Sequence, residues 1–332
     1  MKSRKTAIGI IVSIAGLLLC TAFSLATGAR RVPVADVISA LTDSSLETFD
    51  ALVVRERIPR TIFSLLTGAA LGVSGILMQS ITRNPIADPS VLGVNSGAAL
   101  FVVCGIAYCG VSSAFEYIIF ALVGSAVTSV LVYGLGSIGH GGATPLKLAL
   151  AGTAAATALS SLTSIVMMPK DRVMDSFRFW QIGSVSGGTF DKIVAFIPFL
   201  LVGILMAVIL SPQLNVLALG DDAATGLGAK PVRIRLAGAL AGVLLCGAAT
   251  ALAGPIGFVG LMVPHAIRLI LGSDMRLLVP MSAMGGAILL TVSDIIGRIL
   301  GGTGEIEVGI VTAVLGGPVF VIIAMRAKVK TL

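Results

Sequence analysis

Residues 191–211 read DKIVAFIPFLLVGILMAVILS, and the only two charged side chains of this stretch stand in its first two positions. An uncharged run of about 20 residues is long enough to cross the roughly 30 Å hydrocarbon core of a bilayer as a helix. A helix is the expected spanning element because it satisfies its own backbone hydrogen bonds. The stretch therefore predicts a membrane-spanning helix.

Nine further apolar runs have the same character. They cover residues 6–29, 60–82, 91–110, 115–136, 147–168, 235–253, 256–271, 277–297 and 307–326. Of the 332 residues, 56% are hydrophobic and 12% are charged, whereas soluble domains typically carry about 25% charged residues. We therefore expect an all-α, polytopic membrane protein of about ten transmembrane helices, in which residues 1–332 form a single domain.

The basic residues predict the orientation of this bundle. They precede the first run and follow the last, namely Lys2, Arg4 and Lys5 at one end and Arg326, Lys328 and Lys330 at the other. The first run is longer than a signal-peptide core, so we expect it to be retained. The positive-inside tendency places both termini in the cytoplasm, which requires an even number of spans. The bias is small, because thirteen of the 23 Lys and Arg residues then fall inside and ten outside.

The net charge of +7 is compatible with nucleic-acid binding or with anchoring to anionic lipid headgroups. The basic residues stand singly or in pairs at the ends of the apolar runs, and they form no stripe with interleaved aromatic residues. Anchoring to headgroups is therefore favoured, and nucleic acid is not an expected partner.

Two parts of the sequence share a motif at the same spacing. Gly68-Ala69 and Gly72-Val73 lead to Pro85-Ile86, and Gly238-Ala239 and Gly242-Val243 lead to Pro255-Ile256. Small-xxx-small patterns are common where membrane helices pack, so chance similarity is the alternative. A true repeat pairs the second span with the seventh, which cross in opposite directions. It predicts an inverted repeat of spans 2–5 and 7–10, an architecture found in many transporters.

The sequence lacks the residues that several kinds of chemistry require. No Walker A sequence occurs, so the chain has no P-loop for ATP hydrolysis, and we assign no catalytic residue. His140 and His265 lie far apart without carboxylate neighbours, and no metal site is expected. The four cysteines lie inside apolar runs, and we expect them to be reduced and buried: Cys20, Cys104, Cys109 and Cys246.

Asp294 is the most deeply placed carboxylate, and Arg298 follows it by one helical turn. A proton relay through the membrane would need further ionisable groups along the path. The other runs contain almost none, so we expect a local ion pair between Asp294 and Arg298. This disfavours a proton-driven secondary carrier. Prolines that interrupt the runs at residues 85, 89, 255 and 264 favour a transporter over a simple anchor, because broken helices line cavities or are covered by protein.

Residues 211–235 form the predicted cytoplasmic connection between spans six and seven. Gly220 is expected to end one short helix, and Asp221 or Asp222 to cap the next. The second helix would present Ala223, Ala224 and Leu227 before Gly228 and Pro231 end it. Small and apolar faces of this kind predict a docking surface for another protein. The alternative is an amphipathic loop that packs on its own bundle.

Several motifs resemble one known family. The first half carries Arg57-Ile-Pro-Arg60, Gly68-Ala-Ala-Leu-Gly72, Gln79, Asn84-Pro-Ile-Ala-Asp-Pro89 and Leu92-Gly-Val94. The second half carries Leu219-Gly-Asp-Asp-Ala-Ala224, Leu227-Gly228, residues 254–268, Asp294, Glu305-Ile306, Val308-Gly309, Thr312-Ala313 and Gly316. In this order, over nearly the whole chain, they resemble the permease subunits of vitamin B12, haem and ferric-siderophore ABC importers. Glu307 is a departure, since the family usually has proline there.

The resemblance implies the partners. A second permease subunit, identical or paralogous, two cytoplasmic ATPase subunits and an external substrate-binding protein complete the transporter. ATP and Mg²⁺ would bind the partner ATPase, so this chain is not expected to be an enzyme or to hold a cofactor. The implied location is the cytoplasmic membrane of a prokaryote.

The resemblance also implies roles for particular residues. Residues that face the binding protein are Arg57, Arg60 and Arg298, with Glu305 on the same external face. Residues 211–235 correspond to the coupling loop on the ATPases, with Gly220, Asp221, Asp222, Ala223, Ala224, Leu227 and Gly228 as its contact residues. Residues near the cytoplasmic gate are Asn84, Ile86, Pro145 and Leu146.

The segment 175–184 resembles siderophore-type members more than vitamin-type members, so the expected cargo is a ferric-siderophore-type iron chelate. A plain interfacial anchor is the alternative role of Trp180. Haem or vitamin B12 import is the alternative within the family. A secondary carrier that works without an ATPase is the alternative from another class.

Overall fold

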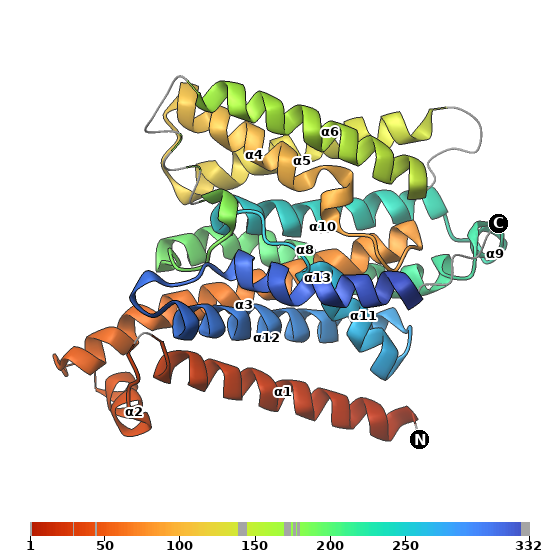
Figure 1. Cartoon of the computed structure of the whole chain (residues 1–332). Helices are drawn as coiled ribbons and strands as arrows, with labels where there is room; N and C mark the ends of the chain where they lie inside the picture. Colours follow the sequence, from red (N-terminus) through yellow and green to blue (C-terminus); the bar gives the residue numbers. More distant parts are fainter. Residues whose placement is uncertain are drawn as a thin grey trace.

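The computed structural model describes residues 2–28, 30–43, 45–138, 145–168, 174, 177 and 180–326, and over these ranges it contains helices and turns but no strand (Figure 1). The helices are α1 (Lys2–Ala26), α2 (Val34–Thr42), α3 (Phe49–Thr82), η1 (Pro89–Leu92), α4 (Val94–Cys104), η2 (Gly105–Cys109), α5 (Ala114–Ser137), α6 (Pro145–Met167), α8 (Phe190–Leu217), α9 (Asp221–Gly226), α10 (Pro231–Ala253), α11 (Val259–Leu271), α12 (Met275–Gly301), η3 (Gly302–Gly304) and α13 (Val308–Arg326).

Each of the ten predicted runs falls on one of these helices or on a directly joined pair. Seven helices are long and apolar enough to cross a membrane, namely α1, α3, α5, α6, α8, α10 and α12. The other three runs correspond to shorter apolar helices over Val94–Cys109, Val259–Leu271 and Val308–Ile323. The expected all-α, polytopic fold is confirmed.

Helix α3 differs from its predicted bounds. It begins at Phe49 rather than at residue 60, and the hydroxyl of Thr48 accepts a hydrogen bond from the Ala51 backbone N–H at 3.3 Å at its N-terminus. Charged residues between 50 and 57 hid this first part, since a span was sought as an uncharged run. The extension and the short helix α2, which packs on it, project beyond the end of the bundle (Figure 1).

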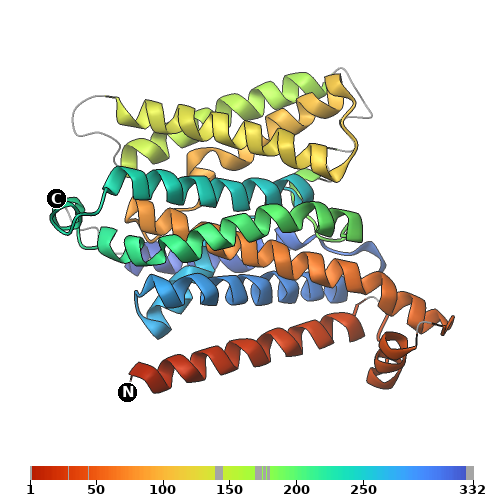
Figure 2. The ribbon, with the colours of Figure 1, turned by 180° about the vertical axis from the view of Figure 1, so that it is seen from behind.

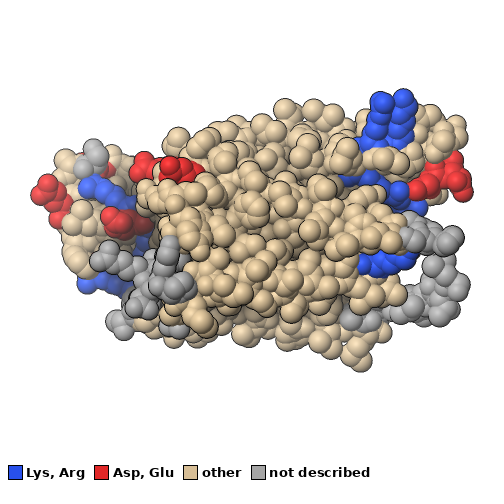
Figure 3. Space-filling model, turned by 90° about the horizontal axis from the view of Figure 1, so that it is seen from above, with Lys and Arg blue, Asp and Glu red and all other residues tan. Residues whose placement is uncertain are grey.

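The charged side chains lie at the two ends of the molecule. Figure 3 shows Lys, Arg, Asp and Glu gathered at both ends of one face, with a broad zone of other residues between them. The long helices also expose apolar side chains such as Leu18, Val130 and Leu201. An uncharged belt between charged ends is the surface expected of a protein that lies across a bilayer.

Helix α3 runs through the centre of the bundle and packs closely on α12 and α11. A Cβ atom at Gly68 or Gly72 would overlap backbone carbonyl groups of α12, and one at Gly75 would overlap the backbone of Gly260 on α11. The small-xxx-small pattern of Gly68 and Gly72 is therefore a helix contact, in which the absence of side chains allows the two backbones to approach closely.

The two halves are arranged as an inverted repeat predicts. Helix α3 packs on α11 and α12, and its counterpart α10 packs on α4 and α5. The breaks that follow them, residues 83–88 after α3 and 254–258 after α10, lie at opposite ends of the bundle (Figures 1 and 2). Equivalent broken segments therefore face opposite sides of the membrane.

The cysteines are free, as predicted, but two of them are not buried. Cys20 and Cys246 are buried, Cys104 is half-buried and Cys109 is exposed. Cys109 ends η2, where the chain leaves the bundle for the turn before α5, so its apolar neighbours in the sequence misled the prediction. His140 lies outside the described residues.

Candidate functional site

The end of the bundle near α2 contains a buried ion network. The Asp294 carboxylate on α12 is 2% exposed and contacts two arginines. Arg60 Nη2 lies 2.7 Å from its Oδ1, and Arg298 Nε lies 3.1 Å from its Oδ2. Arg60 Nη1 also contacts Glu305 Oε2 at 2.8 Å. The predicted ion pair between Asp294 and Arg298 is confirmed, and Arg60 extends it across to α3.

Arginines of this network and its surroundings also hold the end of α1. Arg298 donates hydrogen bonds to the backbone oxygens of Ser24 and Thr27, both at 3.0 Å. Arg57 donates to the backbone oxygens of Leu25 at 2.9 Å and Arg30 at 2.6 Å. These carbonyl groups lie at or beyond the C-terminal turn of α1, where backbone oxygens have no partner within the helix.

The four residues predicted to meet a binding protein therefore lie together but differ in exposure. Arg57 is 9% exposed, Arg298 is 2% exposed, and the side chain of Arg60 is 13% exposed. The Glu305 side chain is 36% exposed. The sequence predicted the Asp294 partner of Arg298, but not the bonds of Arg60 to Asp294 or of Arg298 to α1, which join residues more than 200 positions apart.

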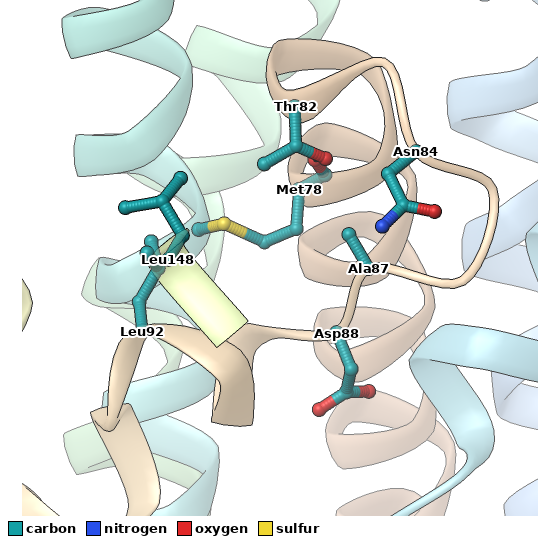
Figure 4. Close-up of a pocket in the computed structure, with 7 residues that line it drawn as sticks. All are labelled: Met78, Thr82, Asn84, Ala87, Asp88, Leu92 and Leu148. Carbon is teal, nitrogen blue, oxygen red and sulfur yellow. The ribbon is translucent and has the colours of Figure 1, made fainter. Parts of the chain in front are cut away.

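The predicted gate residues lie at the opposite end. Asn84 follows the C-terminus of α3, and its Oδ1 accepts the backbone N–H of Ile86 at 3.1 Å, which fixes a tight turn. Asn84 and Leu148 of α6 line the same small cavity (Figure 4), in which Met78 extends toward Leu148. Leu146 is 70% exposed.

The turn after α3 and the start of α6 therefore lie together, and the gate role of these residues stays a prediction. Pro145 is the first residue of α6, and its side chain lies outside the described residues.

Helix α9 has the position of the predicted docking helix, but its surroundings differ from the prediction in two respects. The expected first short helix is the continuation of α8, which runs through Pro212 to Leu217. Gly220 is the N-cap of α9, at a φ of 115° that favours glycine. Ala224 is buried, whereas Asp222, Ala223 and Leu227 are exposed, and Gly228 adopts a φ of 79° after the helix.

The predicted capping role of the aspartates is wrong. Neither Asp221 nor Asp222 caps α9 with its side chain. The Asp221 carboxylate instead accepts hydrogen bonds from Arg235 Nη1 at 2.8 Å and Nη2 at 2.9 Å, and it forms a further ion pair with Arg83. The hydrogen bonds from Arg235 and the positive charges of both arginines hold the pKa of Asp221 below its usual value. Charge-assisted bonds to two guanidinium groups engage both oxygens of this carboxylate.

Helix α6 carries an exposed row of hydroxyl groups that sequence reasoning did not single out. The row consists of Thr153, Thr157, Ser160, Ser161 and Ser164, spaced for one face of a helix. All but one of these hydroxyls are seen to donate to the carbonyl group four residues earlier, at 2.8–3.0 Å. Leu150, Leu162 and Ile165 lie on an adjacent exposed face. A hydroxyl row beside an apolar face indicates contact with water or with another protein rather than with lipid alone.

The segment before α8 is tied to the second half of the chain. Trp180 Nε1 donates to the backbone oxygen of Ala251 on α10 at 2.9 Å, and its ring packs 5.3 Å from that of Phe177. Trp180 therefore holds this segment on the bundle. Residues 175, 176, 178 and 179 of the segment that resembles siderophore-type members lie outside the described residues.

The uncharged belt, the inverted arrangement of broken helices and the small helix α9 beyond the belt define a multi-pass membrane transport protein. The chain belongs to the FecCD transport family, whose model matches residues 16–326. The family resemblance noted in the motifs is confirmed.

Individual relatives cover nearly the whole chain. It is 42% identical over 329 residues to the ferric enterobactin transport system permease protein FepD of Escherichia coli (strain K12), with 98% of each chain covered. It is 39% identical to the Fe(3+)-citrate import system permease protein YfmD of Bacillus subtilis (strain 168), covering 97% of this chain and 94% of that protein. It is 35% identical to the hemin transport system permease protein HmuU of Yersinia pestis, with 82% of each chain covered.

A solved structure has the same fold. It is described as an inward-facing conformation of a metal-chelate type ABC transporter, and it matches with a TM-score of 0.81 and 26% sequence identity over 97% of this chain and 99% of that one.

Proposed function

We propose that this chain is the permease subunit of an ATP-driven ABC importer that carries a ferric-siderophore-type iron chelate across the cytoplasmic membrane of a prokaryote. The observation that carries the proposal is the 42% identity to a ferric enterobactin permease over 98% of both chains. The helix α9 that projects from the bundle beside the gate loop supports it, since a permease without a P-loop needs a surface on which a partner ATPase can act.

The partners follow from the two ends of the molecule. The start of α1, the end of α13 and α9 lie at the same end (Figure 1), which supports two cytoplasmic termini with the ATPase subunits, and their ATP and Mg²⁺, beneath α9. The end with α2, Arg60 and Glu305 then faces outward, toward the substrate-binding protein. Charges arranged around Arg60 suit a partner that presents acidic groups.

A second permease subunit completes the pathway. We place the hydroxyl row of α6 at the interface between two subunits, where it borders the path of the chelate. Separate hydroxyl groups bind a large polar cargo only weakly, so the cargo can pass without being held. A row that faced lipid would have no such role. An identical or a paralogous partner fits this arrangement.

The proposal is tested by reconstituting the chain with its candidate ATPase, partner permease and binding protein in liposomes. Uptake of radioactive ferric enterobactin should require ATP inside the liposomes and the binding protein outside. Uptake without the ATPase would instead establish a secondary carrier. ATP-dependent uptake of haem or vitamin B12, with no uptake of the ferric chelate, would correct the cargo and keep the transporter class.

Neutralising Arg60 is expected to weaken docking of the binding protein. Arg60→Gln removes the least buried charge of the three predicted docking arginines, and loss of one interfacial charge pair corresponds to roughly tenfold weaker binding. Titration of the binding protein onto the permease in nanodiscs measures the change. Arg31→Gln, an exposed basic residue on the same side, is the matched control. Equal affinity of the two variants would contradict the docking role of Arg60.

Arg57 and Arg298 keep their docking role only as a prediction. Because their guanidinium groups point into the protein and hold α1, their reversal would disturb the fold as well as the external surface. Their contribution to docking would therefore be indirect, through the position of α1.

A further inference from the structure

One carboxylate joins the helix that would meet the ATPase to the helix that leads into the gate. Asp221 is the first residue of α9. Its two oxygens are shared between Arg235, in the first turns of α10, and Arg83, the C-cap of α3. A carboxylate held in this two-pronged manner by arginine has a fixed orientation, because the planar guanidinium matches the two oxygens.

Both arginines also bind the ends of neighbouring helices. Arg83 Nε donates to the backbone oxygen of Leu217 at the end of α8, at 3.1 Å. Arg235 Nε donates to the backbone oxygen of Ile81 in the last turn of α3, at 3.2 Å. Carbonyl groups in the last turn of a helix lack a partner within it. Three side chains therefore connect the ends of α3, α8, α9 and α10.

The contact with α3 falls directly before the gate loop. Arg83 precedes Asn84, and its backbone adopts a φ of 51°. Residues other than glycine rarely take this left-handed conformation, and they hold it only where surrounding contacts impose it. The ion pair with Asp221 and the bond to Leu217 are such contacts. A shift of α9 would therefore act on the residue at which α3 ends and residues 84–88 begin.

The opposite side of α9 is free for a partner. Asp222, Ala223 and Leu227 are exposed, whereas Asp221 faces the two arginines. The short helix therefore has one side available to the ATPase and one side fastened to the bundle.

We propose that Asp221, Arg83 and Arg235 form a transmission clamp, a set of positioning residues that passes the movement of α9 to the end of α3 and so to the gate loop at 84–88. The clamp rests on the proposed function, because α9 has to move with an ATPase. It explains how a six-residue helix outside the membrane acts on a gate in another part of the sequence.

The test compares two arginines of α10 that lie two residues apart. Arg235→Gln removes a clamp residue, whereas Arg233→Gln removes the charge of an exposed arginine that has no ion pair among the described residues. The complete transporter is reconstituted in liposomes, and the amount of radioactive ferric enterobactin imported per ATP hydrolysed is measured. Arg235→Gln should lower this ratio about tenfold, a typical size for coupling between sites. It should leave ATP hydrolysis and retention of the ATPase unchanged, and Arg233→Gln should keep the parental ratio.

A second clamp variant guards against a defect confined to one side chain. Asp221→Asn keeps the size of the shared carboxylate and removes its charge, and it should lower the ratio to a similar extent. Equal ratios for Arg235→Gln and Arg233→Gln would overturn the clamp. Loss of the ATPase from both clamp variants would also overturn it, because the residues would then maintain assembly rather than transmit movement. No ATP-dependent uptake by the parental transporter would overturn the proposed function and the clamp with it.

Discussion

Replacing Asp294 by alanine is expected to prevent the permease from accumulating in a folded form. The substitution leaves Arg60 and Arg298 buried without their shared counter-ion. Removing one partner of a buried ion pair typically costs about 3–5 kcal/mol, because the remaining charge stays uncompensated. Size-exclusion chromatography and thermal melting in detergent measure the loss.

Glu305→Gln provides the comparison for Asp294. Glu305 contacts only Arg60 among the charged side chains of this network, and its side chain is 36% exposed. Partly exposed ion pairs contribute about 0–1 kcal/mol, so this variant should melt close to the parental protein. If Asp294→Ala melted at the same temperature as Glu305→Gln, the network would not hold α1, α3 and α12 together.

Replacing Gly72 by leucine is expected to be equally damaging, for a steric reason. Even a Cβ atom at this position would overlap the backbone carbonyl of Ser282 on α12. The two helices would have to separate, which removes the close packing on which association of membrane helices depends. Folded yield and melting temperature in detergent again report the effect.

Gly134→Leu is the matched control for this substitution. Gly134 lies in α5, is exposed, and has no atom within 4 Å of its ideal Cβ position apart from its own local backbone. It should therefore tolerate the larger side chain. Equal losses in both variants would contradict the decisive role of the close contact between α3 and α12.

The positions and order of the apolar helices were predictable because they depend on long uncharged runs, which one sequence displays directly. The start of α3 was not, because a helix that leaves the membrane carries charges such as Asp50 and Arg55 in its exposed turns. The short helix α2 was not predicted either, because its nine residues lie outside any uncharged run long enough to span a membrane.

One interaction of the candidate sites was predictable, the ion pair between Asp294 and Arg298, whereas contacts between distant parts of the chain were not. Arg57 was assigned to docking from the family motif, yet its partners are backbone oxygens at the end of α1, and no sequence pattern identifies such acceptors. Asp221 fits a capping pattern, but two arginines from other helices bind it instead.

The hydroxyl row of α6 did have a signal in the sequence. Threonine and serine recur from Thr153 to Ser164 at helical spacing, but each hydroxyl alone is unremarkable in a membrane helix, where it bonds its own backbone. The row could be recognised as a candidate contact surface only in the structure, which shows that it is exposed beside an apolar face.

An ion network lies at each end of the molecule, and each network joins several helices. At the end near α2, Asp294 joins α3 to α12 and, through Arg298, to α1. At the other end, Asp221 joins α9 to α3 and α10. Helix α3 belongs to both networks and therefore links the two ends of the molecule.

The central claim is that α9 lies inside the cell, where an ATPase can press on it. The most direct measurement is labelling of Leu227→Cys, at a side chain that is 66% exposed, with a membrane-impermeant maleimide, in a protein whose native Cys109 is replaced by serine. Ser45→Cys, in the exposed turn after α2, serves as the external control. The account predicts that intact cells label position 45 alone and that position 227 reacts only after permeabilisation. Labelling of position 227 in intact cells would contradict it.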